Sequence, residues 1–93
     1  RCDAVDVCIP TDLHVQIGLK VIAAGKALLI EKPLAQNFEE AMKLYEASEQ
    51  VGVPFMVGHV ARFFPEIKRA HDLVADGLIG NPGVARSRRG GLA

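Results

Sequence analysis

Three apolar runs divide the first 60 residues, and a stretch with helical spacing follows each of them. The runs cover residues 5–9, 27–30 and 53–57 and are rich in Val, Ile and Leu, which favours β-strands. Pro10 ends the first run because a proline cannot continue a central strand. The run at 27–30 contains no polar residue, which is typical of a strand that is buried on both faces of a parallel sheet.

The segment after the first run predicts a helix over residues 12–24. Leu13, Ile17 and Val21 recur at i, i+4 and i+8, which places them on one helical face. Gly25 follows at the position where a left-handed residue commonly ends a helix. A helix that starts directly after a strand and ends directly before the next is the expected crossover between parallel strands.

Two further helices are predicted. The second follows Asn37, whose side chain caps the helix while Glu40 reaches back toward it. The third begins at Pro65, because proline suits the first turn of a helix. The expected buried positions are Ala41, Leu44, Tyr45 and Ser48 in the second helix and Phe63, Ile67, Ala70 and Val74 in the third, and the closing residues are Gly52 and Gly77.

The repeated order of strand and helix predicts an α/β protein. Strands joined by helical crossovers form parallel βαβ units, and the arrangement here is half of a doubly wound parallel sheet. After a turn at residues 81–83, residues 84–89 predict a fourth strand that is more polar and of a different type. The shift in composition divides the chain into a first domain over residues 1–78 and the start of a second domain over residues 79–93.

Composition and charge argue against several classes of protein. The 93 residues are 49% hydrophobic and 24% charged with no net charge, which favours a folded domain over a disordered chain. No apolar run approaches the roughly 18 residues of a membrane span, and no signal peptide is visible. The neutral charge argues against a nucleic-acid partner, and the cluster Arg86, Arg88 and Arg89 fits a solvated strand face. Because the chain opens at Arg1, we expect it to be an internal piece of a longer protein.

Cys2 and Cys8 are expected to be free thiols. In an extended segment they lie about 20 Å apart, which is beyond the reach of a disulfide. Neither cysteine has the spacing of a metal ligand or of a Cys-x-x-Cys motif. Free cysteines fit a reducing, cytoplasmic compartment.

The chemically suggestive residues follow the three predicted strands, in clusters at 10–14, 31–33 and 58–62. The carboxyl ends of parallel strands share one edge of the sheet, and ligands of open α/β sheets bind outside that edge. We therefore expect all three clusters at one edge. The chain has no Gly-x-Gly-x-x-Gly, no Walker loop, no metal-ligand constellation and no nucleophile elbow, so a complete dinucleotide site is not contained in it.

Thr11 and His14 follow the first strand, and each has two interpretations. The Thr11 hydroxyl either caps the helix, as Asp12 could also do, or donates to a bound cofactor. His14 is either a structural, partly exposed histidine or a binding residue at the sheet edge. His59 is expected to be structural, and His71 is expected on an exposed helix face.

Lys32 follows a predicted buried strand and Glu31. A lysine in that place should be desolvated beside a carboxylate, and it could donate a proton or a hydrogen bond to a substrate oxygen. The alternative is a solvated Glu31–Lys32 pair in a loop. Pro33 is a candidate for a cis peptide bond. Arg62 either binds a carboxylate or phosphate group or pairs with an acid at a domain interface.

Several motifs along the chain resemble those of one family. They are Val-Asp-Val-Cys-Ile-Pro-Thr-x-x-His from Val5, Ala-Gly-Lys from Ala24, Glu-Lys-Pro-Leu-Ala from Glu31, Val-Gly-x-x-x-Arg-Phe-x-Pro from Val57 and Ile-Gly-x-Pro from Ile79. Over nearly the whole chain they resemble the Gfo/Idh/MocA oxidoreductases, which include glucose–fructose oxidoreductase and inositol dehydrogenase. The resemblance implies the second half of a Rossmann-type domain that binds NAD or NADP, followed by the first strand of an α+β C-terminal domain.

The resemblance also implies a reaction and a set of site residues. The cofactor-binding residues would be Pro10, Thr11, His14, Glu31 and Lys32. Thr11 and His14 would line the nicotinamide, and Lys32 would assist proton transfer during hydride transfer. Lys32 and Arg62 would bind the substrate, a sugar, a polyol or a related hydroxyl compound. The glycine-rich loop of the family and the catalytic Asp and His of its C-terminal domain have no counterpart in this chain.

Two other functions stay open. The first is a non-catalytic regulatory protein that senses a nucleotide or a sugar in the same pocket. The second is a phospho-receiver domain, which also ends a strand in Lys-Pro but needs an acceptor Asp at the end of a preceding strand, where this chain has Ile9 and Pro10. An isolated half-sheet would expose an unpaired strand edge and an apolar surface, so we expect it to aggregate or to assemble with a partner. The full-length protein is expected to be a homo-oligomer.

Overall fold

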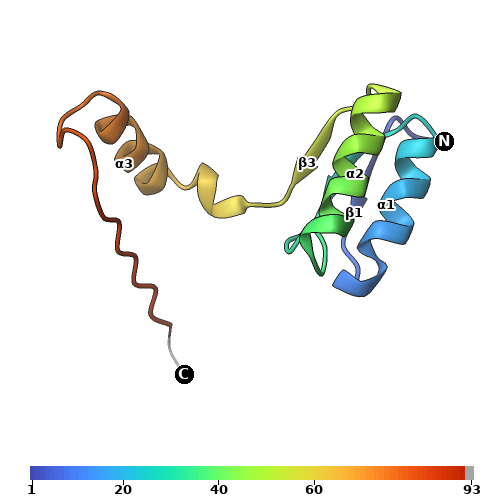
Figure 1. Ribbon diagram of the computed structural model, residues 1–93, viewed down its shortest axis with the longest axis horizontal. Helices are drawn as coiled ribbons and strands as arrows, with labels where there is room; N and C mark the ends of the chain where they lie inside the picture. The colour runs from blue at the N-terminus through green and yellow to red at the C-terminus, as the bar shows by residue number, and fades with distance from the viewer. Residues whose placement is uncertain (92–93) are drawn as a thin grey trace. The chain divides into compact units, whose positions relative to one another are not determined.

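The structure, a computed structural model, describes residues 1–91 and divides the chain into two units, Arg1–His59 and the residues from Val60 onward. The first unit contains the strands β1 (Ala4–Val7), β2 (Ala27–Ile30) and β3 (Phe55–Val57) and the helices α1 (His14–Ala23) and α2 (Phe38–Val51) (Figure 1). A short 3-10 turn, η1 (Thr11–Leu13), precedes α1. The second unit contains the 3-10 turn η2 (Val60–Phe63) and the helix α3 (Pro65–Ala75).

The three strands form a parallel sheet in the order β1-β2-β3, which confirms the predicted βαβ alternation in the first unit. Val7, Ile30 and Val57 lie next to one another in register. The bounds of β2 are those predicted. β1 begins at Ala4, one residue before the first apolar run, and ends at Val7, two residues before that run ends. β3 begins at Phe55, so it is shorter than the run at 53–57.

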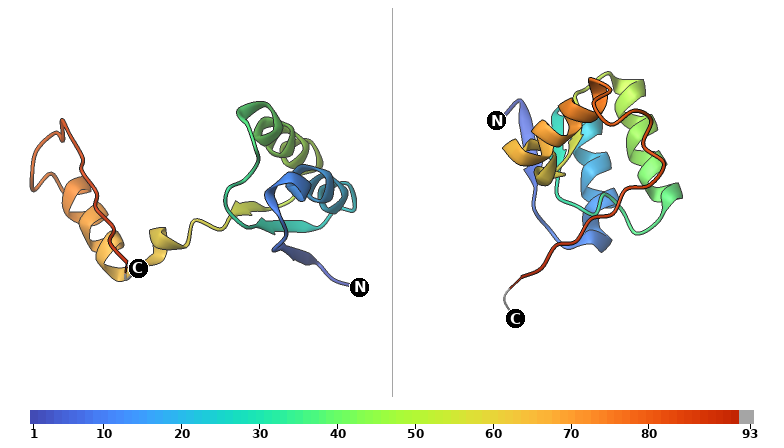
Figure 2. Two further views of the ribbon diagram at one scale, coloured as in Figure 1. Left: turned by 90° about the horizontal axis from the view of Figure 1, so that it is seen from below. Right: turned by 90° about the vertical axis from the view of Figure 1, so that its left-hand side faces the viewer.

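Helices α1 and α2 lie side by side over one face of the sheet (Figure 1), and the left view of Figure 2 shows both of them on the same side of the strands. The buried hydrophobic side chains between these layers are Val7, Val21, Ile22, Leu28, Ile30 and Leu44. Each such side chain stabilises the fold by roughly 1.5–3 kcal/mol relative to an exposed one. This layer of apolar contacts holds the strand ends in place.

The other face of the sheet is open in the described part of the chain. One row across it consists of Asp6, Leu29 and Met56, all three of which are exposed. The prediction that the strand at 27–30 is buried on both faces is therefore wrong here, since Leu29 is 40% exposed. The reason is topological: in the order β1-β2-β3 both right-handed crossovers run in the same direction, so both helices cover the same face.

The predicted glycines end the three helices. After α1 the amide of Gly25 donates to the carbonyl of Ile22, and the amide of Lys26 donates to the carbonyl of Val21. These are the two hydrogen bonds of a Schellman motif, in which the residue after the helix is left-handed. The backbone angle φ is +70° at Gly25, +78° at Gly52 and +79° at Gly77.

Asn37 caps α2 as predicted, because its side-chain oxygen accepts a hydrogen bond from the amide of Glu40 at 2.9 Å. The carboxylate of Glu40 reaches back one residue further than expected and accepts from the amide of Gln36 at 3.3 Å. Of the predicted buried face, Leu44 and Ser48 are buried, Ala41 is half-buried and Tyr45 is 49% exposed.

In the second unit α3 begins at Pro65 as predicted. Its predicted buried face, formed by Phe63, Ile67, Ala70 and Val74, is exposed in the structure. The predicted strand at residues 84–89 is absent, and the prediction is wrong: residues 60–91 contain no other strand with which these residues could form a ladder. Among residues 1–91, no helix has both the length and the apolar character needed to span a membrane.

Candidate functional site at the strand ends

The candidate residues of the first unit lie beyond the carboxyl ends of its parallel strands. The three strands end in register. The amide of Glu31 donates to the carbonyl of Val7 at 3.0 Å, and the amide of Gly58 donates to the carbonyl of Ile30 at 2.8 Å. These bonds extend the ladder past the last strand residues. The clusters at 10–14 and 31–33 therefore emerge at one edge of the sheet, as predicted. Of the third predicted cluster, Gly58 and His59 follow β3 in the first unit, whereas residues 60–62 belong to the second unit.

Glu31 reaches from the end of β2 toward the end of β3. One carboxylate oxygen, Oε2, accepts a hydrogen bond from the amide of Lys32 at 3.0 Å. A Cβ placed on Gly58 would lie 3.3 Å from the other oxygen, Oε1. The Glu31 side chain is half-buried. Its carboxylate fits beside β3 because Gly58 has no side chain there. The sequence places Gly58 at a strand end but does not show that its missing side chain makes room for Glu31.

Lys32 is exposed, which contradicts the expectation of a desolvated lysine. The physical reason is that β2 stops at Ile30, so Lys32 belongs to the loop that follows and not to the buried strand. In the described residues its ammonium group forms no ion pair with Glu31, whose carboxylate instead accepts from the Lys32 backbone. The peptide bond between Lys32 and Pro33 is cis, as predicted.

Thr11 begins the turn η1 and is half-buried. The residue at the N-cap position is Pro10, whose carbonyl accepts from the amide of Leu13 at 3.0 Å. Neither η1 nor α1 has a capping hydrogen bond from a side chain. The capping interpretation of Thr11 and Asp12 is therefore wrong, and the Thr11 hydroxyl is left available at the sheet edge.

His14 is completely buried at the first residue of α1, so the expectation of a partly exposed histidine is wrong. Its Nε2 lies 2.8 Å from the carbonyl oxygen of Ile9, and its Nδ1 lies 3.2 Å from the carbonyl oxygen of Leu34. Both ring nitrogens are thus engaged within the first unit. This arrangement leaves neither nitrogen for direct contact with a bound molecule.

Cys8 lies between β1 and Pro10 and is exposed, as is Cys2. The Cys8 thiol donates to the carboxylate of Asp6 at 3.5 Å. This hydrogen bond, together with partial desolvation and the nearby charges of Asp6 and Glu31, raises the pKa of the Cys8 thiol. The thiolate and not the thiol is the nucleophile, so a raised pKa lowers the nucleophilic reactivity of Cys8.

Arg62 belongs to the second unit, in the turn η2, and is exposed. It contributes to a hollow of about 470 Å³ whose other lining residues are Phe63, Ile67, Lys68 and His71. Phe63 and Ile67 are apolar, Arg62 and Lys68 carry positive charge, and His71 adds an imidazole ring. All five lining residues belong to the second unit.

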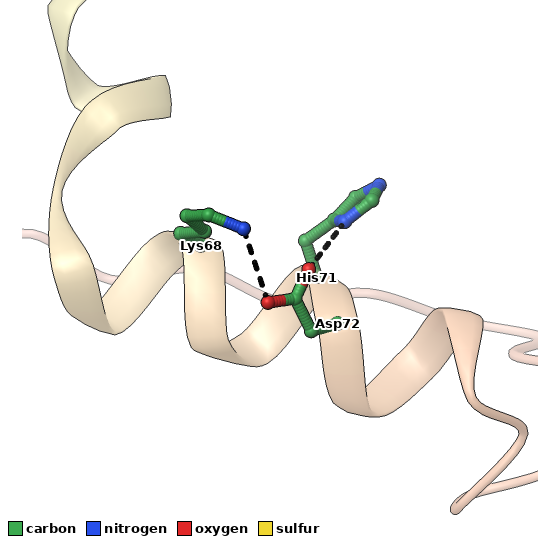
Figure 3. Close-up of polar contacts among 3 residues, drawn as sticks. All are labelled: Lys68, His71 and Asp72. Atoms are coloured by element: carbon green, nitrogen blue, oxygen red, sulfur yellow. Dashed lines mark hydrogen bonds and ion pairs between the residues drawn. The ribbon is translucent and has the colours of Figure 1, made fainter.

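The charges beside this hollow are partly neutralised by Asp72 (Figure 3). Lys68 Nζ lies 3.2 Å from one oxygen of Asp72, and His71 Nδ1 lies 3.4 Å from the other. The hydrogen bond from Lys68, followed by that from His71, lowers the pKa of the Asp72 carboxyl. The Asp72 side chain is 41% exposed, so solvent screens this pair of contacts.

Comparison with known proteins is consistent with this geometry. Residues 1–59 match the family model described as the oxidoreductase family with an NAD-binding Rossmann fold. The chain is 33% identical over 89 residues to 2,7-anhydro-N-acetylneuraminate hydratase of Escherichia coli, a match that covers 96% of the chain and 24% of that protein. It is 38% identical over 84 residues to 1,5-anhydro-D-fructose reductase of Ensifer adhaerens, covering 90% of the chain and 25% of that protein.

A solved structure gives the same result. The apo scyllo-inositol dehydrogenase of Lactobacillus casei superposes with a TM-score of 0.79 at 30% identity, covering 85% of the chain and 24% of that protein. The fold is thus that of an NAD-binding Rossmann domain, with a parallel sheet and helices. The chain belongs to the Gfo/Idh/MocA family of oxidoreductases. It spans about a quarter of the length of the relatives that it matches.

The strand-end residues fit one part of a dinucleotide. The Thr11 hydroxyl is not used as a cap, and Gly58 leaves room beside the Glu31 carboxylate, so both polar groups can bond to a ribose or a carboxamide. A pyrophosphate needs a glycine-rich turn at a helix N-terminus, and the sequence has no Gly-x-Gly-x-x-Gly. The described residues therefore fit hydrogen bonds to a ribose or a carboxamide, and the turn that binds a pyrophosphate is not among the 93 residues.

Proposed function

We propose that the full-length protein is an NAD(P)-dependent oxidoreductase that transfers a hydride between a nicotinamide cofactor and a sugar, a polyol or a related hydroxyl compound. The observation that carries the proposal is the family match over residues 1–59, the segment in which Thr11, Glu31 and Lys32 follow neighbouring parallel strands. The names of two relatives, a reductase of 1,5-anhydro-D-fructose and a dehydrogenase of scyllo-inositol, support the substrate class.

The proposal includes the place of the chain in its domain. Residues 1–78 would form the second half of a Rossmann domain, and residues 79–93 would begin an α+β domain for substrate binding and homo-oligomerisation. The unidirectional strand order supports this assignment, since one half of a doubly wound sheet runs outward from the centre. The missing glycine-rich turn supports it as well, because that turn belongs to the first half.

In this function a nicotinamide bound at the strand ends supplies the site that accepts or gives the hydride. Thr11 and the ring of Pro10 would contact the nicotinamide side, and the Glu31 carboxylate would accept hydrogen bonds from the ribose. In the reductive direction the Lys32 ammonium would donate a proton to the carbonyl oxygen as the hydride reaches the carbon. In the oxidative direction its neutral amine would take the hydroxyl proton.

Arg62, in the second unit, would bind the substrate. Its guanidinium carries five donors in a fixed plane and suits hydroxyl or carboxylate oxygens. His14 is not assigned a direct contact, because its ring is buried and both nitrogens face backbone carbonyls. The substrate side of the site would be completed by residues outside this chain.

The experiment that tests the proposal uses the full-length protein. Fluorescence titration with NADH and with NADPH measures cofactor binding, and the absorbance of the reduced nicotinamide measures turnover of 1,5-anhydro-D-fructose and of scyllo-inositol. We expect saturable binding of at least one cofactor and turnover of a cyclic polyol or sugar. Absence of binding to both cofactors contradicts the proposal. Binding without turnover across a broad panel of sugars and polyols favours a sensor instead of an enzyme.

A further inference from the structure

His14 is the one histidine of the described chain that is removed from water, and its partners show what it holds. Nε2 contacts the carbonyl of Ile9, and Nδ1 contacts the carbonyl of Leu34. Ile9 lies directly before Pro10 and Thr11, and Leu34 lies directly after Lys32 and Pro33. The ring thus connects the two loops on which the proposed site depends.

The backbone ladder does not make this connection. Its last bond between β1 and β2 runs from the amide of Glu31 to the carbonyl of Val7, and the two chains then separate into loops. Among the hydrogen bonds of the described residues, those of His14 are the only ones that connect residues 8–13 with residues 32–36. Ile9 and Leu34 also pack against the core, but the hydrogen-bonded connection between the Thr11 turn and the Lys32 loop is made by this one side chain.

The number of protons on the His14 ring decides how many of the two contacts can be hydrogen bonds at one time. A carbonyl oxygen only accepts, so each contact needs an N–H on the ring. A neutral imidazole carries one N–H and can donate to one carbonyl at a time, whereas a ring with two protons donates to both. The contact at Nε2 is the shorter, 2.8 Å against 3.2 Å, which makes Ile9 the firmer of the two partners.

From this arrangement we infer that His14 is a positioning residue, which fixes the Lys32 loop relative to the Thr11 turn without touching substrate or cofactor. The inference rests on the proposed function for its catalytic consequence, but not for the contact itself. His14 would therefore affect the rate of turnover indirectly, through its contact with the Leu34 carbonyl. A displacement of about 1 Å in a catalytic group can lower a rate by about a hundredfold, so one such contact is sufficient to matter.

Two substitutions separate the two contacts. The amide nitrogen of asparagine takes a place close to Nδ1, and that of glutamine takes a place close to Nε2. His14→Asn therefore retains the Leu34 contact and loses the Ile9 contact, whereas His14→Gln retains Ile9 and releases Leu34. In the full-length protein we expect H14Q to lower kcat about tenfold or more while the Kd for NADH changes less than about twofold. We expect H14N to weaken cofactor binding more than it lowers kcat.

Hydrogen exchange of backbone amides gives a readout that needs no cofactor. Residues 32–36 should exchange faster in H14Q than in H14N. Gln16→Asn, at an exposed residue of α1, is the control and should leave exchange and kinetics unchanged. If H14Q and H14N give the same kinetic and exchange pattern, His14 is only a core residue and the inference is overturned. If the wild type binds neither NADH nor NADPH, the proposed function fails while the exchange comparison still decides the contact.

A measurement on the unsubstituted protein keeps the inference testable if a variant does not fold. In full-length protein with 15N-labelled histidine, the Nε2 proton of His14 should exchange with water much more slowly than the ring protons of His71. Rapid exchange of the His14 ring N–H overturns the inference, because a buried ring that donates to the carbonyl of Ile9 or Leu34 protects its proton.

Discussion

Gly18 on α1 faces Leu44 on α2 so closely that a Cβ on Gly18 would lie 2.7 Å from Leu44 Cδ2. The same Cβ would lie 3.3 Å from Leu28 Cδ2 on the sheet below. Gly18 is therefore the point at which the two helices and the sheet come together. The absence of a side chain lets α1 approach the rest of the core, in the layer that also buries Ile22 and Ile30.

Gly18→Ala should destabilise the protein. Alanine favours the helix over glycine by about 1 kcal/mol, but overpacking a filled core costs about 1–3 kcal/mol, so we expect a net loss of about 1 kcal/mol. Urea denaturation of the full-length protein measures it. In the double variant with Leu44→Ala the added methyl has space, and the loss should be smaller than the sum of the two single losses. Additive losses would contradict the contact.

Asn37→Ala should destabilise α2, because the side-chain oxygen of Asn37 is the partner of the otherwise unpaired Glu40 amide. Loss of an N-cap of this kind costs about 1 kcal/mol. Asn37→Asp is the matched control, since aspartate accepts the same bond and its charge suits a helix N-terminus. The midpoint of urea denaturation should fall for alanine and stay close to wild type for aspartate, with an unchanged slope. Equal midpoints for both variants would refute the cap.

The features that were predicted correctly from the sequence depend on neighbours close in the chain. Gly25, Gly52 and Gly77 end helices because a single residue supplies the left-handed conformation. Asn37 caps α2 through a hydrogen bond to a residue only three positions further along the chain. The strand at 27–30 is bounded by residues that break strands. Parallel pairing then follows from the length of the crossovers.

The features that were missed depend on distant partners. His14 contacts a carbonyl 20 residues away, so neither its burial nor its two contacts could be inferred from the local pattern. Leu29 was expected to be buried because an apolar strand is usually covered twice, but strand order decides which face the helices cover. The prediction of a strand at 84–89 was wrong for a related reason. A strand needs a neighbouring strand to pair with, and the local sequence pattern does not show whether one is present.

The Asp72 carboxyl should titrate below the usual range for aspartate, because Lys68 and His71 donate to its charged form. A lowered folded-state pKa means that the contribution to stability is present at neutral pH and is lost as the pH falls through that pKa. Lys68→Ala should move the pKa of Asp72 back up, as measured by carboxyl 13C shifts in an NMR titration. Lys20→Ala, on α1, is the control. An unmoved Asp72 titration in the Lys68 variant would show that the pair has no electrostatic effect.

Gly58→Ala should weaken cofactor binding in the full-length protein with little loss of stability. The added Cβ would lie 3.3 Å from Glu31 Oε1 and would displace the carboxylate that we assign to the ribose. We expect the Kd for NADH to rise roughly fivefold, which corresponds to about 1 kcal/mol. Gly83→Ala is the matched control, because nothing lies within 4 Å of its added Cβ. Unchanged affinity in the Gly58 variant would remove Glu31 from the proposed cofactor site.

Lys32→Ala should lower turnover far more than it lowers cofactor affinity. Lys32 is exposed in the loop that follows β2, so removal of its side chain leaves the core intact while removing the group that we assign to proton transfer. A loss in kcat of more than tenfold, equal to about 1.4 kcal/mol in the activation free energy, is expected in steady-state kinetics of the full-length protein. Lys20→Ala controls for the loss of a surface charge. Turnover retained within tenfold would mean that another group transfers the proton.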